Sequence, residues 1–216
     1  MHYFSLRFDQ GLDWYRSCFP APRQENGRST ITGEASPYYL FHPHAPRRMA
    51  EAVPRARLIA LLRNPVDRAY SHYRMIVGFG REPLPFEEAL TAEEARLSGE
   101  KAKMLADERY HSFAHQYLSY LSRGIYVDQL IHWSKFFSDE QMLVLKSEDF
   151  FERTPETLKL VLDFLGLPDW EPEAWKIILK GEYDQEMDPA TRRRLEEYFE
   201  PHNRRLYEYL GVDLGW

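Results

Sequence analysis

The sequence predicts an α/β fold in which helices flank a parallel sheet. Two apolar runs, Leu58–Leu62 and the start of Met142–Phe150, have the length and composition of strands buried in such a sheet. Segments with helical spacing of apolar residues separate and follow these runs, as the α/β class requires. The chain has 216 residues, 44% of them hydrophobic, which suits a single domain over residues 1–216.

The N-terminal quarter is expected to contain one helix, one short strand and a second helix. "GLDWYRSCF" predicts a helix over residues 11–19 that ends before Pro20. "TITGEA", residues 30–35, is rich in β-branched residues and predicts a strand. "RRMAEAV", residues 47–53, predicts a helix that Pro54 ends.

The clearest strand is "RLIALLR", residues 57–63, whose continuous apolar run is typical of a strand covered on both faces. A helix is expected to begin directly after it. Asn64 fits the N-cap, Pro65 the first helical position, and Asp67 the first turn, where an acidic side chain is favoured.

The remainder of the chain alternates helices with one more strand. "MLVLKSEDF", residues 142–150, predicts that strand, and Gly166 is a natural stop for the helix that follows it. The further helices are expected over residues 86–121, 124–137, 155–167 and 190–211.

Composition excludes several classes of function. A formal net charge of −6 argues against a dedicated nucleic-acid-binding protein. Cys18 is the only cysteine, so the chain has neither a disulfide framework nor a thiolate metal cluster. No apolar run is long enough to span a bilayer, and "MHYFSLRFDQ" lacks the features of a signal peptide. We therefore expect a cytoplasmic protein.

Arg63 is the first candidate for a functional residue. Ligands of parallel α/β sheets bind beyond the carboxyl ends of the strands, and the N-terminus of the following helix attracts anions. Arginine offers a forked, permanently charged set of donors that suits phosphate, and Ser71 lies about two turns further along the helix. A strand-end arginine can also pair with a carboxylate, so the motif alone leaves both interpretations open.

Five ordered segments together resemble the sulfotransferase family, most closely the branch with the heparan sulfate sulfotransferases and their bacterial relatives. They are "HYFS…GLDWYRSCFP", "ITGEASPYYL…APRR", "RNPVDRAYS", "GIYVDQLIHWSKFF" and "FEPHNRRLYEYLGVDLGW". The resemblance implies a P-loop NTPase-like parallel sheet flanked by helices. It also implies that Arg63 and Ser71 contact the 3'-phosphate of 3'-phosphoadenylyl sulfate (PAPS), the sulfonate donor of the family.

The same resemblance implies the reaction and its other residues. A sulfonate group would pass from PAPS to a hydroxyl or amine of a carbohydrate-like or small-molecule acceptor, without a metal ion. Glu34 matches the general base of the family, followed by Ala35 where relatives often have lysine. Lys180 and Gly181 match a loop that folds over the nucleotide, with Glu182 where relatives can have arginine.

Histidine pairs are the remaining candidates for chemistry. His42 and His44 have no companion acid or cysteine ligand nearby in the sequence, and "HSFAH", which contains His111 and His115, lacks the glutamate of a zinc protease motif. The sequence therefore predicts no metal site at either pair.

The resemblance also implies a segment that the sequence does not contain. Relatives hold the 5'-phosphosulfate in a P-loop of the form Lys-x-Gly-Thr-Thr, between the first strand and first helix, whereas here Met1 directly precedes the "HYF" segment. We expect the domain to be incomplete at its N-terminus, lacking that strand and loop. The alternative is a non-catalytic remnant that binds a nucleotide bisphosphate or serves as an interaction domain. A nucleotide kinase would need a Gly-x-x-x-x-Gly-Lys loop and would not explain "RNPVDRAYS".

Overall fold

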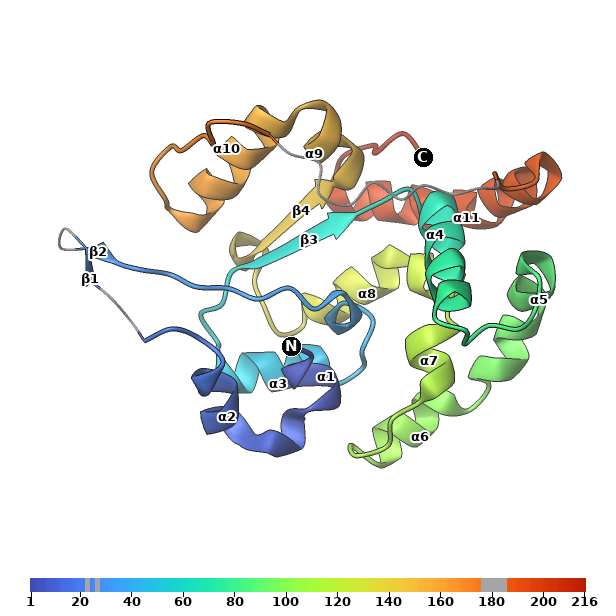
Figure 1. Ribbon diagram of the computed structural model, residues 1–216. Coiled ribbons are helices and arrows are strands. Elements are labelled where there is room, and N and C mark those ends of the chain that lie inside the picture. Colours follow the sequence, from blue (N-terminus) through green and yellow to red (C-terminus); the bar gives the residue numbers. More distant parts are fainter. Residues whose placement is uncertain (22–23, 26–27, 176–185) are drawn as a thin grey trace.

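A computed structural model describes residues 1–21, 24–25, 28–175 and 186–216, and it confirms the α/β class (Figure 1). Its strands are β1 Gln24–Glu25, β2 Arg28–Ser29, β3 Leu58–Leu62 and β4 Met142–Lys146. Its α-helices are α1 Tyr3–Leu6, α2 Gly11–Ser17, α3 Ala45–Ala52, α4 Pro65–Gly78, α5 Phe86–Leu97, α6 Glu100–Ala106, α7 Phe113–Tyr117, α8 Tyr126–Trp133, α9 Ser147–Glu152, α10 Thr154–Leu165 and α11 Pro189–Leu210. Short 3₁₀ turns are η1 Phe8–Gln10, η2 Pro37–Tyr39, η3 Ser122–Gly124 and η4 Asp139–Gln141.

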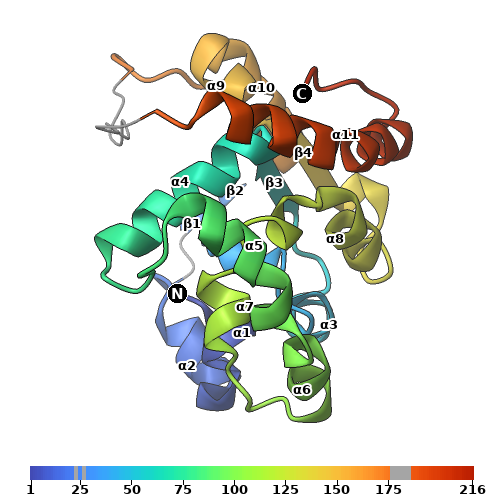
Figure 2. The same cartoon turned by 90° about the vertical axis from the view of Figure 1, so that its right-hand side faces the viewer.

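The centre of the fold is the parallel pair β3–β4, in register from Leu58 opposite Met142 to Leu62 opposite Lys146. Helices α1, α2 and α3 form a group near the start of β3, whereas α4 and α5–α7 extend from its carboxyl end (Figure 1). Helix α11 crosses the end of the sheet and lies beside α8 and α4 (Figure 2). Every helix in the described ranges is too short or too polar to cross a bilayer.

Three connected hydrophobic clusters make up the core. The first lies between α4, α5 and α11 and includes Ile76, Leu90 and Phe199. The second joins the N-terminal helices to α3 and α8 through aromatic side chains such as Phe4. The third packs α8 and α11 against the sheet through Leu62. Long-range packing of amphipathic faces, more than local propensity, therefore holds these short helices.

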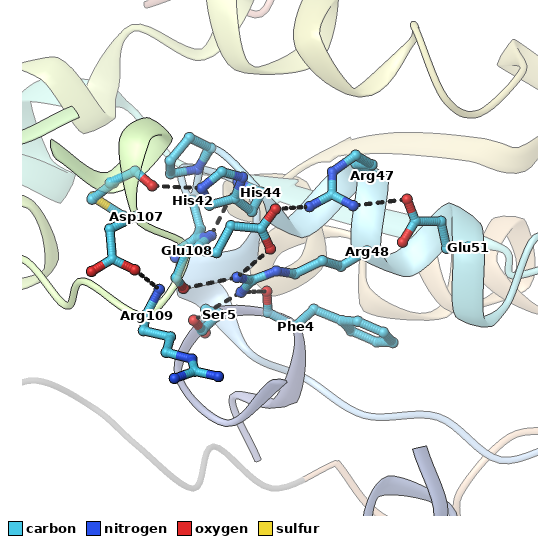
Figure 3. A network of polar contacts seen from close by, with 12 residues as sticks. Phe4, Ser5, His42, His44, Arg47, Arg48, Glu51, Asp107, Glu108 and Arg109 are labelled. Atoms are coloured by element: carbon cyan, nitrogen blue, oxygen red, sulfur yellow. Dashed lines mark hydrogen bonds and ion pairs between the residues drawn. The ribbon is translucent and has the colours of Figure 1, made fainter. Parts of the chain in front are cut away.

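A buried arginine joins the N-terminal helix to the rest of the molecule (Figure 3). Arg48 on α3 is 2% exposed and donates to the carbonyls of Phe4 (3.2 Å), Ser5 (3.4 Å) and Glu108 (3.0 Å) and to the Glu108 carboxylate (3.2 Å). These hydrogen bonds engage both terminal nitrogens of the buried guanidinium and offset the cost of its burial. Arg48 thereby fixes α1 against α3 and the loop that contains Glu108.

Several sequence predictions about strands are wrong. Residues 30–36 are not in a strand, because β2 ends at Ser29 and pairs only with β1, so residues 30–36 have no ladder partner among the described residues. β-Branched composition alone does not create a strand without a neighbour to pair with. The expected cover on both faces of β3 also fails, since Ile59 and Leu61 are 40% and 49% exposed. The second strand stops at Lys146, and the next residues turn into α9.

The helices agree better with the sequence. The expected cap of α4 is confirmed, as is the stop of α10 at Gly166, which has a φ of 68°. The helix expected over residues 86–121 is instead three helices: Gly99, with a φ of 74°, separates α5 from α6, and the extended Asp107 ends α6. Residues 3–6, for which no helix was predicted, form α1.

Gly124 allows three elements to meet closely, which predicts a specific cost of substitution. A β-carbon added there would lie 2.7 Å from the ring of Phe199 on α11 and 3.1 Å from Pro65 at the start of α4. We expect Gly124→Ala to destabilise the fold by about 1–3 kcal/mol, the usual cost of overpacking a core.

Urea denaturation measures this effect, and Gly78→Ala is the matched control. Gly78 is in α4 with nothing within 4 Å of an added β-carbon. Its replacement should leave stability unchanged or slightly raised. Equal stabilities of the two variants would contradict the close contact at Gly124.

Candidate functional site

The site is built where β3 and β4 end side by side. Asn64 caps α4, and its side-chain Oδ1 accepts a hydrogen bond from the amide of Val66 (2.9 Å). Its own main-chain N–H donates to Glu148 Oε1 (2.8 Å), just beyond the end of β4. The two strand ends are thus tied together by a charge-assisted hydrogen bond. Arg63 therefore lies at a fixed position next to the N-terminus of a 14-residue helix.

Helix α8 holds the main chain of Arg63 from the other side. The hydroxyl of Tyr126 donates to the Arg63 carbonyl (2.8 Å). Burial raises the pKa of Tyr126 to about 12, so the hydroxyl keeps its proton for this bond. The Arg63 backbone is fixed while the residue itself remains exposed.

A cavity of about 570 Å³ opens beside Arg63, and we name it the arginine cavity. Its lining is Pro37, Leu40, Leu61, Arg63, Arg68, Ser71, His72, Arg74, Met75, Arg123, Tyr126 and Gln129. Four of these residues are arginines and none carries a carboxylate. The chemistry of this lining suits an anion with several oxygen atoms.

Two of the arginines are half-buried and have no carboxylate partner among the described residues, although Arg123 lies over the rings of Tyr38 (5.1 Å) and Phe41 (5.4 Å). Arg68 donates to the carbonyl of Tyr120, and Arg123 donates to those of His115 (3.2 Å) and Gln116 (2.6 Å). Within the described part of the chain neither forms an ion pair, and the Nε atom of each lacks a hydrogen-bond partner. Burial, helped by the charge of Arg68, lowers the pKa of Arg123 to about 9. A bound anion would relieve this repulsion.

Glu34 lies on the extended segment that precedes η2, and hydroxyl groups surround its carboxylate. Tyr39 Oη lies 3.0 Å from Oε1 and 3.2 Å from Oε2, and Ser36 Oγ lies 3.0 Å from Oε2. Both hydroxyl-bearing residues are buried, and Glu34 itself is half-buried. The carboxylate is therefore oriented but remains accessible.

A second cavity, of about 540 Å³, connects Glu34 to the sheet. Glu34 lies on one wall, residues of β3 and β4 form the other, and Trp133 lines it as well. Pro37, Leu40 and Leu61 line both this cavity and the arginine cavity, so the two adjoin. A ligand held at the arginines could thus extend toward the carboxylate.

The structure brings together three of the five residues that the sequence predicts for the site. Arg63 and Ser71 line the arginine cavity, and Glu34 lines the adjoining one. Lys180 and Gly181, predicted to cover a nucleotide, lie outside the described residues.

Four further basic residues of the arginine cavity had no role predicted from the sequence: Arg68, His72, Arg74 and Arg123. A signal for Arg68 and His72 exists, because Arg68, Ser71, His72 and Met75 follow helical spacing and share one face of α4. Arg123 gives no such signal, since it belongs to a 3₁₀ turn whose position depends on distant contacts.

Comparison with known proteins identifies the family of this chain. The model of the sulfotransferase domain family matches residues 7–198. Human heparan sulfate glucosamine 3-O-sulfotransferase 3B1 is 31% identical over 238 residues, which cover 100% of this chain and 56% of that protein. The bifunctional heparan sulfate N-deacetylase/N-sulfotransferase 1 of Caenorhabditis elegans is 28% identical over 93% of this chain and 24% of its own length.

A solved structure is similar as well. The sulfotransferase from Alicyclobacillus acidocaldarius superimposes with a TM-score of 0.63 and 31% identity, over 82% of this chain and 63% of that one. The chain thus spans only about half the length of the human relative named above.

His72 predicts how the stability of this region depends on pH. Burial lowers its pKa to about 2, and the charges of Arg123 and Arg68 act in the same direction. Below pH 6.5 His72 binds a proton in the unfolded chain but not in the folded protein. The free energy of unfolding therefore falls as the pH falls. From pH 7.5 to pH 5 this should remove about 2 kcal/mol of unfolding free energy.

Replacement of His72 by phenylalanine should reduce that loss. The His72 ring packs edge-on against Tyr120 at 5.1 Å, a contact that phenylalanine can reproduce. Urea denaturation at both pH values should show a smaller loss in His72→Phe. The exposed His111→Phe is the control and should match the parent. An unchanged pH dependence in His72→Phe would show that other groups cause it.

Proposed function

Because this chain belongs to the sulfotransferase domain family, we propose that it transfers a sulfonate group from PAPS to a hydroxyl or amine of a carbohydrate-like acceptor. The observation that carries the proposal is the arginine cavity, free of carboxylates, next to the cavity of Glu34. The names of two relatives specify heparan sulfate, which supports a saccharide as the acceptor.

The arginine cavity fits the 3'-phosphate of the donor. Arg63 can present its forked donors from the strand end, Ser71 adds a hydroxyl from α4, and the N-terminus of α4 favours negative charge. Arg68 and Arg123, each with an Nε atom that lacks a partner, supply positive charge from the floor of the cavity. An anion at this place would stabilise the folded protein as well as orient the donor.

Glu34 is assigned the role of general base. PAPS, when bound, supplies a sulfonate on a phosphate leaving group. The acceptor oxygen or nitrogen forms a bond to sulfur and loses its proton to the Glu34 carboxylate. The bond between sulfur and the phosphate oxygen breaks, which leaves adenosine 3',5'-bisphosphate. Catalysis thus requires one positioned base and positive charge near the nucleotide.

The assignment of the arginine cavity predicts the effect of Arg63→Ala. Binding of adenosine 3',5'-bisphosphate should weaken by about 2 kcal/mol, as expected for the loss of a charge-assisted contact to phosphate. Ser71→Ala should weaken binding less, because it removes a neutral donor.

Isothermal titration calorimetry measures both effects, with Arg16→Ala as the control. Arg16 is exposed on α2, away from the cavity, and its replacement should leave binding unchanged. Unchanged affinity in both Arg63→Ala and Ser71→Ala would rule out the phosphate assignment.

The assignment of Glu34 predicts that Glu34→Gln lowers turnover by roughly a hundredfold or more, with little change in nucleotide affinity. Transfer of labelled sulfonate from PAPS to a heparan sulfate oligosaccharide measures turnover. Glu140→Gln, at an exposed position of η4, is the control.

Two outcomes would change this assignment. Near-normal turnover of Glu34→Gln at saturating acceptor would show that another group takes the proton. Binding of the bisphosphate without turnover in the parent would favour the alternative of a non-catalytic nucleotide-binding domain.

A further inference from the structure

The hydroxyl groups around Glu34 have a fixed direction of hydrogen bonding. The main-chain N–H of Phe4 donates to Tyr39 Oη (3.2 Å), and that of His2 donates to Ser36 Oγ (3.0 Å). An amide N–H can only donate, so each hydroxyl oxygen accepts from the main chain. A hydroxyl has a single proton, and the Glu34 carboxylate, which can only accept and lies 3.0 Å from each hydroxyl, is the stronger acceptor for both. Both protons therefore point at Glu34.

The main-chain donors are held in place by buried contacts far from the cavities. Phe4 is 0% exposed, and its carbonyl accepts from Arg48, itself 2% exposed. A connected path therefore runs from Arg48 through Phe4 and Tyr39 to Glu34, and Figure 3 shows its first part. Tyr15 of α2 stacks on Tyr3 at 4.5 Å and closes the aromatic cluster around this path.

The tyrosine hydroxyls around Glu34 keep their protons. Burial raises the pKa of the Tyr39 hydroxyl, so it remains a proton donor. Burial also raises the pKa of Tyr15, and the charge of Glu34 raises it further. The charge of the same carboxylate acts to raise the pKa of His2, although burial lowers that pKa overall. A carboxylate that accepts directed hydroxyl protons is confined to one orientation.

We propose that Tyr39 and Ser36 are positioning residues that hold the Glu34 carboxylate in the orientation needed to take the acceptor's proton. The inference rests on the proposed role of Glu34 as general base. Tyr39 Oη lies closest to Oε1 (3.0 Å) and Ser36 Oγ lies 3.0 Å from Oε2, so one hydroxyl holds each carboxylate oxygen. A carboxylate has about four lone-pair sites, which leaves room for the acceptor's proton. That proton passes to the Glu34 carboxylate as the acceptor atom bonds to sulfur, and neither hydroxyl gains or loses a proton.

Tyr39→Phe is the main test, because it removes the hydroxyl and keeps the ring that packs on Phe4 at 5.5 Å. The turnover number should fall roughly tenfold, while the KM for PAPS stays unchanged, since the donor is held elsewhere. The matched control is Tyr38→Phe. Tyr38 is also buried, but its hydroxyl bonds to His115 Nδ1 (2.8 Å), so this variant should keep parental turnover.

Ser36 gives an independent comparison if loss of the Tyr39 hydroxyl prevents folding. Ser36→Ala should lower turnover, and the conservative Ser36→Thr, which retains a hydroxyl, should restore most of it. Thermal melting of each variant identifies those that are folded. A fall in turnover that Ser36→Thr does not recover, or no fall in any folded variant, would overturn the proposal.

A double-mutant cycle separates failure of this inference from failure of the proposed function. If Tyr39 acts through Glu34, adding Tyr39→Phe to Glu34→Gln should slow turnover no further. A further tenfold loss would show an independent role for Tyr39. Full activity of Glu34→Gln would instead reject the base itself.

The hydrogen bond can also be tested without turnover. With a carbon-13 label at the ζ carbon of tyrosine, the resonance missing in Tyr39→Phe identifies Tyr39. That resonance should shift in Glu34→Gln, and the Tyr38 resonance should not. No shift at Tyr39 would overturn the proposal even if the enzyme lacked activity with the chosen acceptor.

Discussion

The parallel pairing of β3 with β4 is the constraint on which the rest of the site depends. Because the register runs from Leu58–Met142 to Leu62–Lys146, both strands end at the same edge of the sheet. The cap of α4 therefore meets Glu148, which ties the two strand ends together through the main-chain N–H of Asn64. A shift of register would separate Asn64 from Glu148 and would move Arg63 relative to the end of β4.

The arginine cavity next to this edge brings together positive charges that the fold does not require for its stability. Arg68 and Arg123 are half-buried, satisfy part of their donors with main-chain carbonyls, and repel one another. Buried cations without carboxylate partners are unfavourable, and folded proteins keep them chiefly where a ligand compensates them. Arg48, by contrast, forms an ion pair with Glu108 and holds α1 through hydrogen bonds to main-chain carbonyls. Arginine thus has two roles in this protein: one group lines the cavity, and Arg48 holds a helix in place. The partners of each side chain show which role it has.

Glu34 shows how a functional carboxylate can be held without a strand. Its segment has no ladder partner among the described residues, so backbone hydrogen bonds of a sheet do not fix it. Hydroxyl groups of Tyr39 and Ser36 orient the side chain, and these depend on main-chain donors of α1 and its N-terminal neighbour. The rigid part of this arrangement is the aromatic cluster of Tyr3, Phe4 and Tyr15.

The sequence by itself determined the α/β class, the positions of β3 and α4, the cap at Asn64 and the stop at Gly166, because these features depend on neighbouring residues. The family resemblance selected Arg63, Ser71 and Glu34, and the structure shows the first two in one cavity and the third in the adjoining one. Only the tertiary structure decided that residues 30–36 lack a strand partner, that Gly99 divides a predicted helix, and that Arg123 joins the arginine cavity. It also decided that Phe4 aims the hydroxyl of Tyr39, 35 positions away. Except for the break at Gly99, which is a local backbone effect, these outcomes depend on contacts between residues far apart in the chain, and no local pattern of residues encodes such contacts.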